Sequence, residues 1–160
     1  MNNTLNTISA LLADKTLPRE ATLEKVLREV LQQFRSETGT IHRLDESAQL
    51  LHLVAQVGLP PQMLGIVKTI PVGKGIAGQV AAENRPVTIC NLQTDSSGVA
   101  NPGAKQTGVG GALCVPIRHA DTLRGTLGIG TLREHEYSAA EINSLQDIAD
   151  LLGKQEIYKL

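Results

Sequence analysis

Residues 70–87 read IPVGKGIAGQVAAENRPV, and this segment limits the possible folds more than any other. It holds glycines in the spacing G-x-G-x-x-G, which dinucleotide-binding proteins place between a parallel strand and a full-length helix. Here the helix expected at 76–83 and the strand expected at 86–90 are both short. The acidic residue at the required distance, Asp95, falls in a polar loop. The segment therefore argues against a dinucleotide-binding fold.

The same glycines have two interpretations, which are compatible with each other. Gly73 and Gly75 permit a tight turn, while Gly78 lets the short helix pack closely on the sheet. The second interpretation is functional. The backbone amides at the helix start, with Lys74 nearby, would form one wall of a site for an anion or a small polar ligand.

Strand patterns lie on both sides of this segment. Runs of β-branched and aliphatic residues, separated by polar turns at 45–47 and 120–122, are typical of antiparallel hairpins. Pro71 interrupts another run, which indicates an edge strand. The expected strands are 40–45, 50–57, 66–72, 86–90, 112–119 and 123–132.

Helical periodicity marks both ends of the chain. Apolar residues at 5, 8, 11 and 12 predict an opening helix that ends near Asp14. Pro18 suits the first turn of a second helix, which carries an apolar stripe over 23–34 and is expected to stop at Gly39. Ser138 and Glu141 form a capping box that begins the closing helix. A further short helical segment is expected at 62–65.

These elements predict an α+β fold with a single antiparallel sheet of about six strands. The N-terminal and C-terminal helices would cover one face. Short helices and the long irregular loop at 91–111 would lie over a pocket on the other face, because long loops in compact domains are often lids or binding loops.

Composition excludes several function classes. The formal net charge is −1, and the chain has two tyrosines, one phenylalanine and no tryptophan, so it lacks the basic surface and stacking platforms of nucleic-acid-binding proteins. It shows neither a secretion signal nor an apolar run long enough to span a membrane, and we expect a cytoplasmic protein. The two cysteines stand far apart in the sequence, so neither a C-x-x-C metal site nor a disulfide framework is expected.

Several segments together resemble the GAF domain family. They are residues 70–87, ALCVPI at 112–117, LRGTLGI at 123–129 and YSAAEINSLQDIA at 137–149. The resemblance runs from about residue 8 to 152. It implies a GAF-like fold, related to the profilin and PAS folds, over residues 1–160. The core would span about 8–152, with an N-terminal helix at 1–17 and a C-terminal helix extension at 153–160.

The resemblance also implies a function: a non-catalytic sensory module that binds a small molecule and signals through its helices. One enzymatic branch of the family reduces free methionine sulfoxide with several cysteines, and this remains the alternative. Cys114 lies in an apolar run and is expected to be a buried small side chain, which leaves Cys90 as the candidate thiol. Family members that attach a tetrapyrrole use a cysteine usually followed by histidine, and neither Cys90 nor Cys114 is followed by one. Members that bind a cyclic nucleotide carry a phenylalanine in their ligand motif, whereas Phe34, the one phenylalanine of this sequence, lies in an early helix.

The resemblance implies a pocket bordered by the short helix at 76–83, the strand after it and the loop at 91–111, and the candidate ligand-binding residues lie in or next to these segments. They are Lys74, Gly75, Ile76, Gly78, Cys90, Asn91 and Thr107. His42 and His52 would stand opposite one another in one register of the first hairpin, but without a third ligand in view no metal site is expected. No catalytic residue and no cofactor is predicted.

Apolar residues on the flanks of the helices suggest a homodimer through residues 19–36 and 138–158. Ala21, Leu151 and Ile157 are the flanking residues concerned. Binding of the unidentified small molecule would then act on an output domain or partner protein, whereas a ligand-free dimerisation module is a further alternative.

Overall fold

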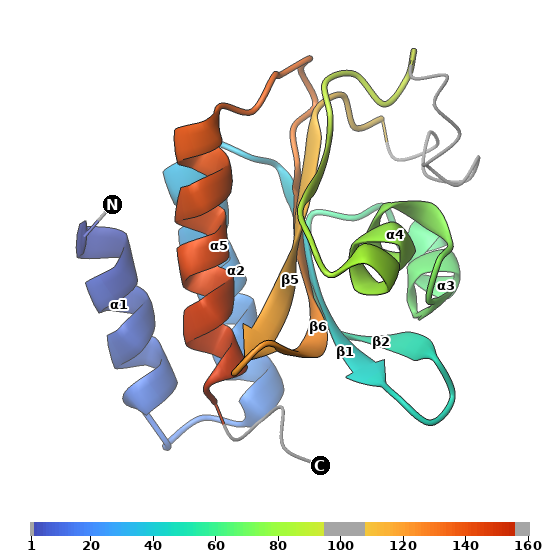
Figure 1. Cartoon of the computed structure of the whole chain (residues 1–160). Helices are drawn as coiled ribbons and strands as arrows, with labels where there is room; N and C mark the ends of the chain where they lie inside the picture. The colour runs from blue at the N-terminus through green and yellow to red at the C-terminus, as the bar shows by residue number, and fades with distance from the viewer. Residues whose placement is uncertain (1, 95–107, 156–160) are drawn as a thin grey trace.

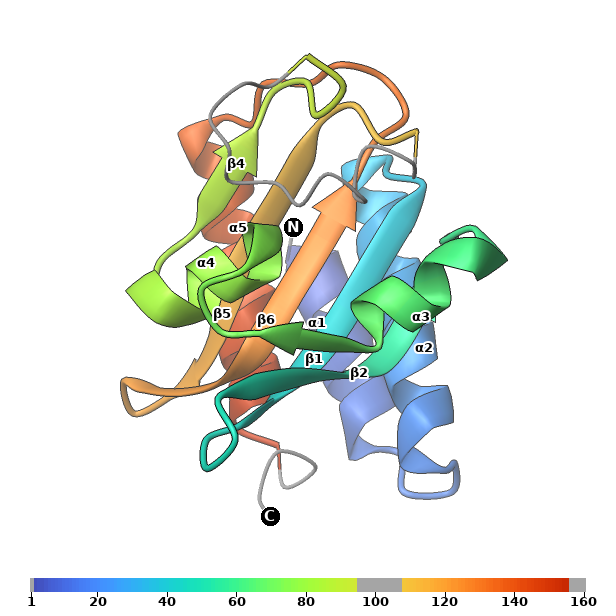
Figure 2. The ribbon, with the colours of Figure 1, turned by 90° about the vertical axis from the view of Figure 1, so that its right-hand side faces the viewer.

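A six-stranded antiparallel sheet forms the centre of the structure, with strand order β3-β2-β1-β6-β5-β4. The computed structural model describes residues 2–94 and 108–155. Figure 1 shows the long helices on one side of the sheet and the short helices α3 (Leu64–Val67) and α4 (Gly75–Glu83) on the other, and Figure 2 looks onto the side that carries α4. The predicted α+β architecture, with its two unlike faces, is confirmed.

The strands are β1 (Thr38–Asp45), β2 (Leu50–Val57), β3 (Thr69–Pro71), β4 (Val87–Ile89), β5 (Ala112–His119) and β6 (Thr122–Gly130). Most lie where the periodicity predicts them. The exception is 66–72, where the first residues form part of α3 (Leu64–Val67), preceded by a short 3-10 helix, η1 (Pro61–Met63). The amide of Lys68 bonds back to Leu64 at 2.9 Å, so that pairing with β2 begins only at Thr69.

Both predicted hairpins are present, but the first has an irregular register. A bulge between Ile41 and His42 shifts β1 against β2, so His52 stands opposite Arg43 and His42 opposite Leu53. The expected pairing of His42 with His52 is therefore wrong by one residue. The second hairpin turns at Ala120 and Asp121, whose φ values of 49° and 65° match the mirror-image turns that suit twisted strands.

The helix layer consists of α1 (Asn2–Ala13), α2 (Arg19–Phe34) and α5 (Ala139–Gly153). Apolar side chains of these helices and of β1, β5 and β6 form the main core. The capping box at the start of α5 is confirmed, since the Ser138 hydroxyl accepts the Glu141 amide and the Glu141 side chain accepts the Ser138 amide.

Gly39 does not end the second helix. Arg35, in the left-handed conformation with a φ of 49°, caps α2, while Gly39 lies inside β1. A Cβ atom at position 39 would lie 3.0 Å from Leu31 Cδ2 and 3.2 Å from Leu27 Cδ2. The glycine is therefore explained by the close approach of α2 to the strand.

The opening helix α1 packs against α2 and, less extensively, against α5 (Figure 1). It buries Ile8 and Leu12 there, which covers part of the apolar surface that suggested a dimer. Ala21 and Leu151 are half-buried, and Ile157 lies outside the described residues. Within 2–94 and 108–155, the exposed large hydrophobic side chains are Leu64, Ile66 and Leu132, all outside the helix layer.

None of the helices in the described part of the chain has the length and apolar character needed to cross a membrane. Among the same residues, no group of three or more His, Cys, Asp or Glu side chains is placed to hold a metal ion.

Candidate functional site

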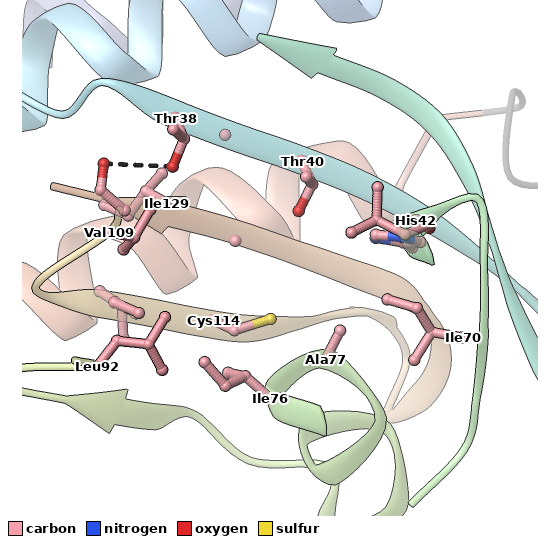
Figure 3. Close-up of a pocket in the computed structure, with 16 residues that line it drawn as sticks. Thr38, Thr40, His42, Ile70, Ile76, Ala77, Leu92, Val109, Cys114 and Ile129 are labelled. Carbon is pink, nitrogen blue, oxygen red and sulfur yellow. Dashed lines mark hydrogen bonds between the residues drawn. The ribbon is translucent and has the colours of Figure 1, made fainter. Parts of the chain in front are cut away.

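A cavity of about 140 Å³ lies between the sheet and α4 (Gly75–Glu83), on the face opposite the long helices. Figure 3 shows side chains of the central strands on one side of it, Ile76, Ala77 and Leu92 on the other, and Val109 beside Thr38 and Ile129 at one end. The lining residues are Thr38, Gly39, Thr40, His42, Val67, Ile70, Ile76, Ala77, Leu92, Val109, Ala112, Leu113, Cys114, Gly128, Ile129 and Gly130.

The polar groups of this cavity come mainly from one strand. Thr38, Thr40 and His42 alternate along β1, so their side chains share the cavity face of the sheet. The Thr38 hydroxyl donates to the carbonyl of Gly130 at 3.4 Å (Figure 3). Thr40 is half-buried and its hydroxyl makes no hydrogen bond to the described residues. The β1 wall therefore offers a polar stripe in an otherwise apolar space.

His42 is the most buried polar member of the stripe, with a relative exposure of 1%. Its Nε2 lies 2.8 Å from the carbonyl oxygen of Val67, at the end of α3. Its Nδ1 is buried and has no hydrogen-bond partner within the described part of the chain. Burial lowers the pKa of His42 below its ordinary value and outweighs the opposing effect of the Val67 hydrogen bond, while His52 lowers it further, so the neutral imidazole is favoured at neutral pH.

The wall facing β1 is apolar. Ile76 and Ala77 supply it from α4 and Leu92 from the segment after β4, whereas Val109 packs beside Gly130 at one end of the cavity. No side chain lining the described cavity is an acid, a lysine or an arginine. Because burying an isolated charge is costly, this lining favours an uncharged occupant.

A second cavity of about 230 Å³ lies beside the first, beneath α3 and the start of α4. Val67, Ile70, Ile76 and Ala77 line both cavities, so these side chains form the boundary between them. The other lining residues of the second cavity are Met63, Ile66, Thr69, Pro71, Lys74 and Gly75.

The structure brings together part of the predicted site. Ile76 borders both cavities, whereas Lys74 and Gly75 border only the second. Gly78 has a packing role, since a Cβ there would lie 2.6 Å from the carbonyl oxygen of Pro71. Gly73 and Gly75 have φ values of 93° and 64°, which confirms the predicted turn. Thr107 lies outside the described residues.

Cys90 and Asn91 lie apart from these two cavities. The thiol of Cys90 is 3.6 Å from Glu134 Oε1, and the amide nitrogen of Asn91 is 3.4 Å from Glu134 Oε2. Desolvation and the Glu134 carboxylate both raise the pKa of the Cys90 thiol. Neither residue lines the described cavities.

Cys114 lies on the cavity wall and is buried, as its apolar sequence context predicts. Burial raises the pKa of its thiol to about 12. The side chain is therefore a neutral thiol at neutral pH, and it contributes a small, weakly polar surface to the cavity.

The sequence interpretation missed the polar stripe on β1. A signal was present, because 38, 40 and 42 alternate with positions that face the helices and two of them carry hydroxyls. The pattern predicted a strand but gave no reason to connect it with α4, which follows more than thirty residues later.

Two of three comparisons place this chain among known proteins. A family model described as GAF domain matches residues 16–154. Comparison with curated protein sequences gives no match. Among solved structures, the GAF domain of a phosphoenolpyruvate-protein phosphotransferase from Coxiella burnetii is 20% identical with a TM-score of 0.81, covering 98% of this chain and 92% of that one. The equivalent domain from Acinetobacter is 20% identical with a TM-score of 0.79, covering 94% and 89%.

A catalytic protein has a similar fold. Free methionine-R-sulfoxide reductase from Neisseria meningitidis, in complex with its substrate, is 18% identical with a TM-score of 0.78, covering 97% of this chain and 87% of that one. At these identities the structural likeness shows the fold alone. The family match, in contrast, spans most of the sequence. The chain belongs to the GAF domain family.

Proposed function

We propose that this chain is a sensory or regulatory GAF domain that binds a small, uncharged molecule in the cavity between the sheet and α4. The observation that carries the proposal is the cavity itself, which combines an apolar α4 wall with a polar stripe on β1. Ligand sites are typically concave and apolar, with few polar groups that orient the ligand. Two GAF domains of phosphotransferases share this fold, and a sensory or regulatory role is what the resemblance to the GAF family implies.

Signal transmission would use the two faces of the central strands. Thr40 and His42 face the cavity, whereas Ile41 between them belongs to the core beneath the helices. A ligand that shifts β1 would therefore also shift the packing of α2 and α5. Such a ligand favours the conformation that it binds best, and so changes what the helix layer presents to a partner or output domain.

A larger side chain on α4 that fills the cavity should displace the bound small molecule. We expect native mass spectrometry of freshly purified protein to show a co-purifying molecule in the wild type and at least a tenfold lower occupancy in Ala77→Met, because Ala77 lines both cavities. Ala82→Met is the matched control, since Ala82 lies on the exposed side of the same helix. Equal occupancy in the two variants would contradict a ligand site beneath α4.

The same spectra test the homodimer, which stays a prediction. Its basis is the half-buried Ala21 of α2 and Leu151 of α5, and the expected mass is that of two chains. A mass of one chain at micromolar concentration would remove the dimer from the proposed mechanism without affecting the ligand site.

The alternative function is reduction of free methionine sulfoxide, the reaction named for one of the similar structures. That chemistry needs an accessible thiolate. Cys90 is exposed, but Glu134 disfavours its thiolate, and Cys114 is buried with a pKa of about 12. We therefore expect the wild type, with a thiol reductant, to reduce free methionine-R-sulfoxide no faster than Cys90→Ser. Turnover that Cys90→Ser abolishes would instead establish the enzyme.

A further inference from the structure

We propose that His42 selects the ligand of the cavity by accepting a hydrogen bond at Nδ1, so that the ligand is a neutral molecule with a hydroxyl or N–H group on an otherwise apolar body. This inference rests on the proposed function and adds the chemical class of the ligand. It is carried by two observations: His42 lines the cavity, and its ring nitrogen Nδ1 is buried without a hydrogen-bond partner among the described residues.

The hydrogen bond to Val67 decides which nitrogen of His42 carries the proton. A backbone carbonyl can only accept, so the contact of 2.8 Å requires a hydrogen on Nε2. In the neutral ring the other nitrogen, Nδ1, then has a lone pair and no hydrogen. The ring is held in this tautomer by the protein, and it presents an acceptor before any ligand arrives.

The Nδ1 acceptor is costly for the protein in the absence of a ligand. Buried polar groups are normally hydrogen-bonded, and an orphaned one loses its interaction with water without replacement. His42 Nδ1 is buried, and no described residue donates to it. A donor from a bound ligand would remove this cost, which makes the interaction selective for ligands that have such a donor.

The remaining lining sets the rest of the ligand's chemistry. No charged side chain lines the cavity, so an ionised carboxylate or phosphate would lose its hydration without compensation. Ile76 and Leu92 offer an apolar surface to the opposite side of the ligand (Figure 3). The hydroxyl of Thr40, two residues before His42 on the same face, lies about 7 Å further along the strand and suits a second polar group.

Phenol and toluene are suitable probes because they differ mainly in one O–H group. An apolar cavity of about 150 Å³ can hold a benzene ring, and the cavity described here has a similar volume. Both dissociation constants can be measured by NMR titration of the full chain. The ratio of the two affinities is the useful quantity, because toluene enters any apolar site more readily than phenol does.

His42→Gln tests the acceptor while keeping the link to α3. The glutamine amide nitrogen can still donate to the Val67 carbonyl, whereas its amide oxygen, the remaining acceptor, is displaced from the position of Nδ1. We expect the preference for phenol over toluene to fall on the order of tenfold in this variant. His119→Gln, the same substitution at an exposed histidine of β5 that lines neither cavity, should retain that preference. An unchanged preference in a folded His42→Gln protein would overturn the inference.

A second readout uses the wild type and does not depend on the variants. Long-range ¹H–¹⁵N spectra of the histidine rings should show His42 as the Nε2–H tautomer, and phenol but not toluene should shift the Nδ1 resonance. If phenol binds against Ile76 and Ala77 without moving that resonance, His42 is not the acceptor, although the cavity still binds ligands. If neither probe binds, this inference fails, and occupancy in native mass spectrometry decides the proposed function separately.

Discussion

Leu127→Ala is expected to lower the free energy of unfolding by about 2–5 kcal/mol, the range for removing a large buried side chain from a well-packed core. Leu127 is fully buried. It lies in the central strand β6, opposite Ile41 of β1 and Val115 of β5. All three belong to the main core beneath the helices, so the lost methyl groups leave a cavity that the rigid sheet cannot close. Urea denaturation followed by circular dichroism measures the change.

Leu132→Ala is the control, because it removes the same atoms from a side chain that is 58% exposed just beyond the same strand. Its expected effect is within about 0.5 kcal/mol of zero. Similar losses in the two variants would mean that Leu127 does not pack between the sheet and the helix layer as described.

Gly78→Ala is expected to cost about 1–3 kcal/mol, in the range for overpacking, and to disturb the roof of the cavity. The added Cβ would lie 2.6 Å from the carbonyl oxygen of Pro71 and 3.1 Å from the amide nitrogen of Gly73. These neighbours are backbone atoms. They are also held in place, since the amide of Gly73 donates to the carbonyl of Gly78 at 2.8 Å. Relief therefore requires α4 to move away from the end of β3.

Gly65→Ala gives the matched comparison in another short helix. A Cβ at Gly65 would have no atom within 4 Å, so this variant should be neutral or slightly more stable, given the preference of helices for alanine over glycine. Thermal denaturation of both variants, with native mass spectrometry for bound molecules, separates the two effects. Equal stability of Gly78→Ala and the wild type would contradict the close packing of α4.

Local patterns predicted most of the secondary structure. The apolar stripe of α2, the capping box of α5 and the turns of both hairpins act over a few residues, and the structure has these features where they were expected. The G-x-G-x-x-G segment was correctly assigned to a turn before a short helix. Its resemblance to the GAF family also agrees with the family match over 16–154.

The errors arose where contacts with distant residues override local preference. Gly39 was expected to end a helix, but it lies in β1, where its lack of a side chain lets α2 pack closely on the strand. Residues 66 and 67 have strand-like side chains, yet they complete α3, whose end bonds to His42. The pairing of the two histidines depended on a bulge that no sequence pattern signalled.

By itself, the sequence determined most of the helices and strands of this protein and the antiparallel pairing within its two hairpins, because these depend on short-range periodicity and turn residues. The tertiary structure alone decided which residues share the cavity. It placed Thr40 and His42 of β1 opposite Ile76 and Ala77 of α4, and it left Cys90 beside Glu134 instead. The physical reason is that a cavity is enclosed by side chains from segments distant in the chain. Their meeting depends on sheet order and register, which local propensities do not encode.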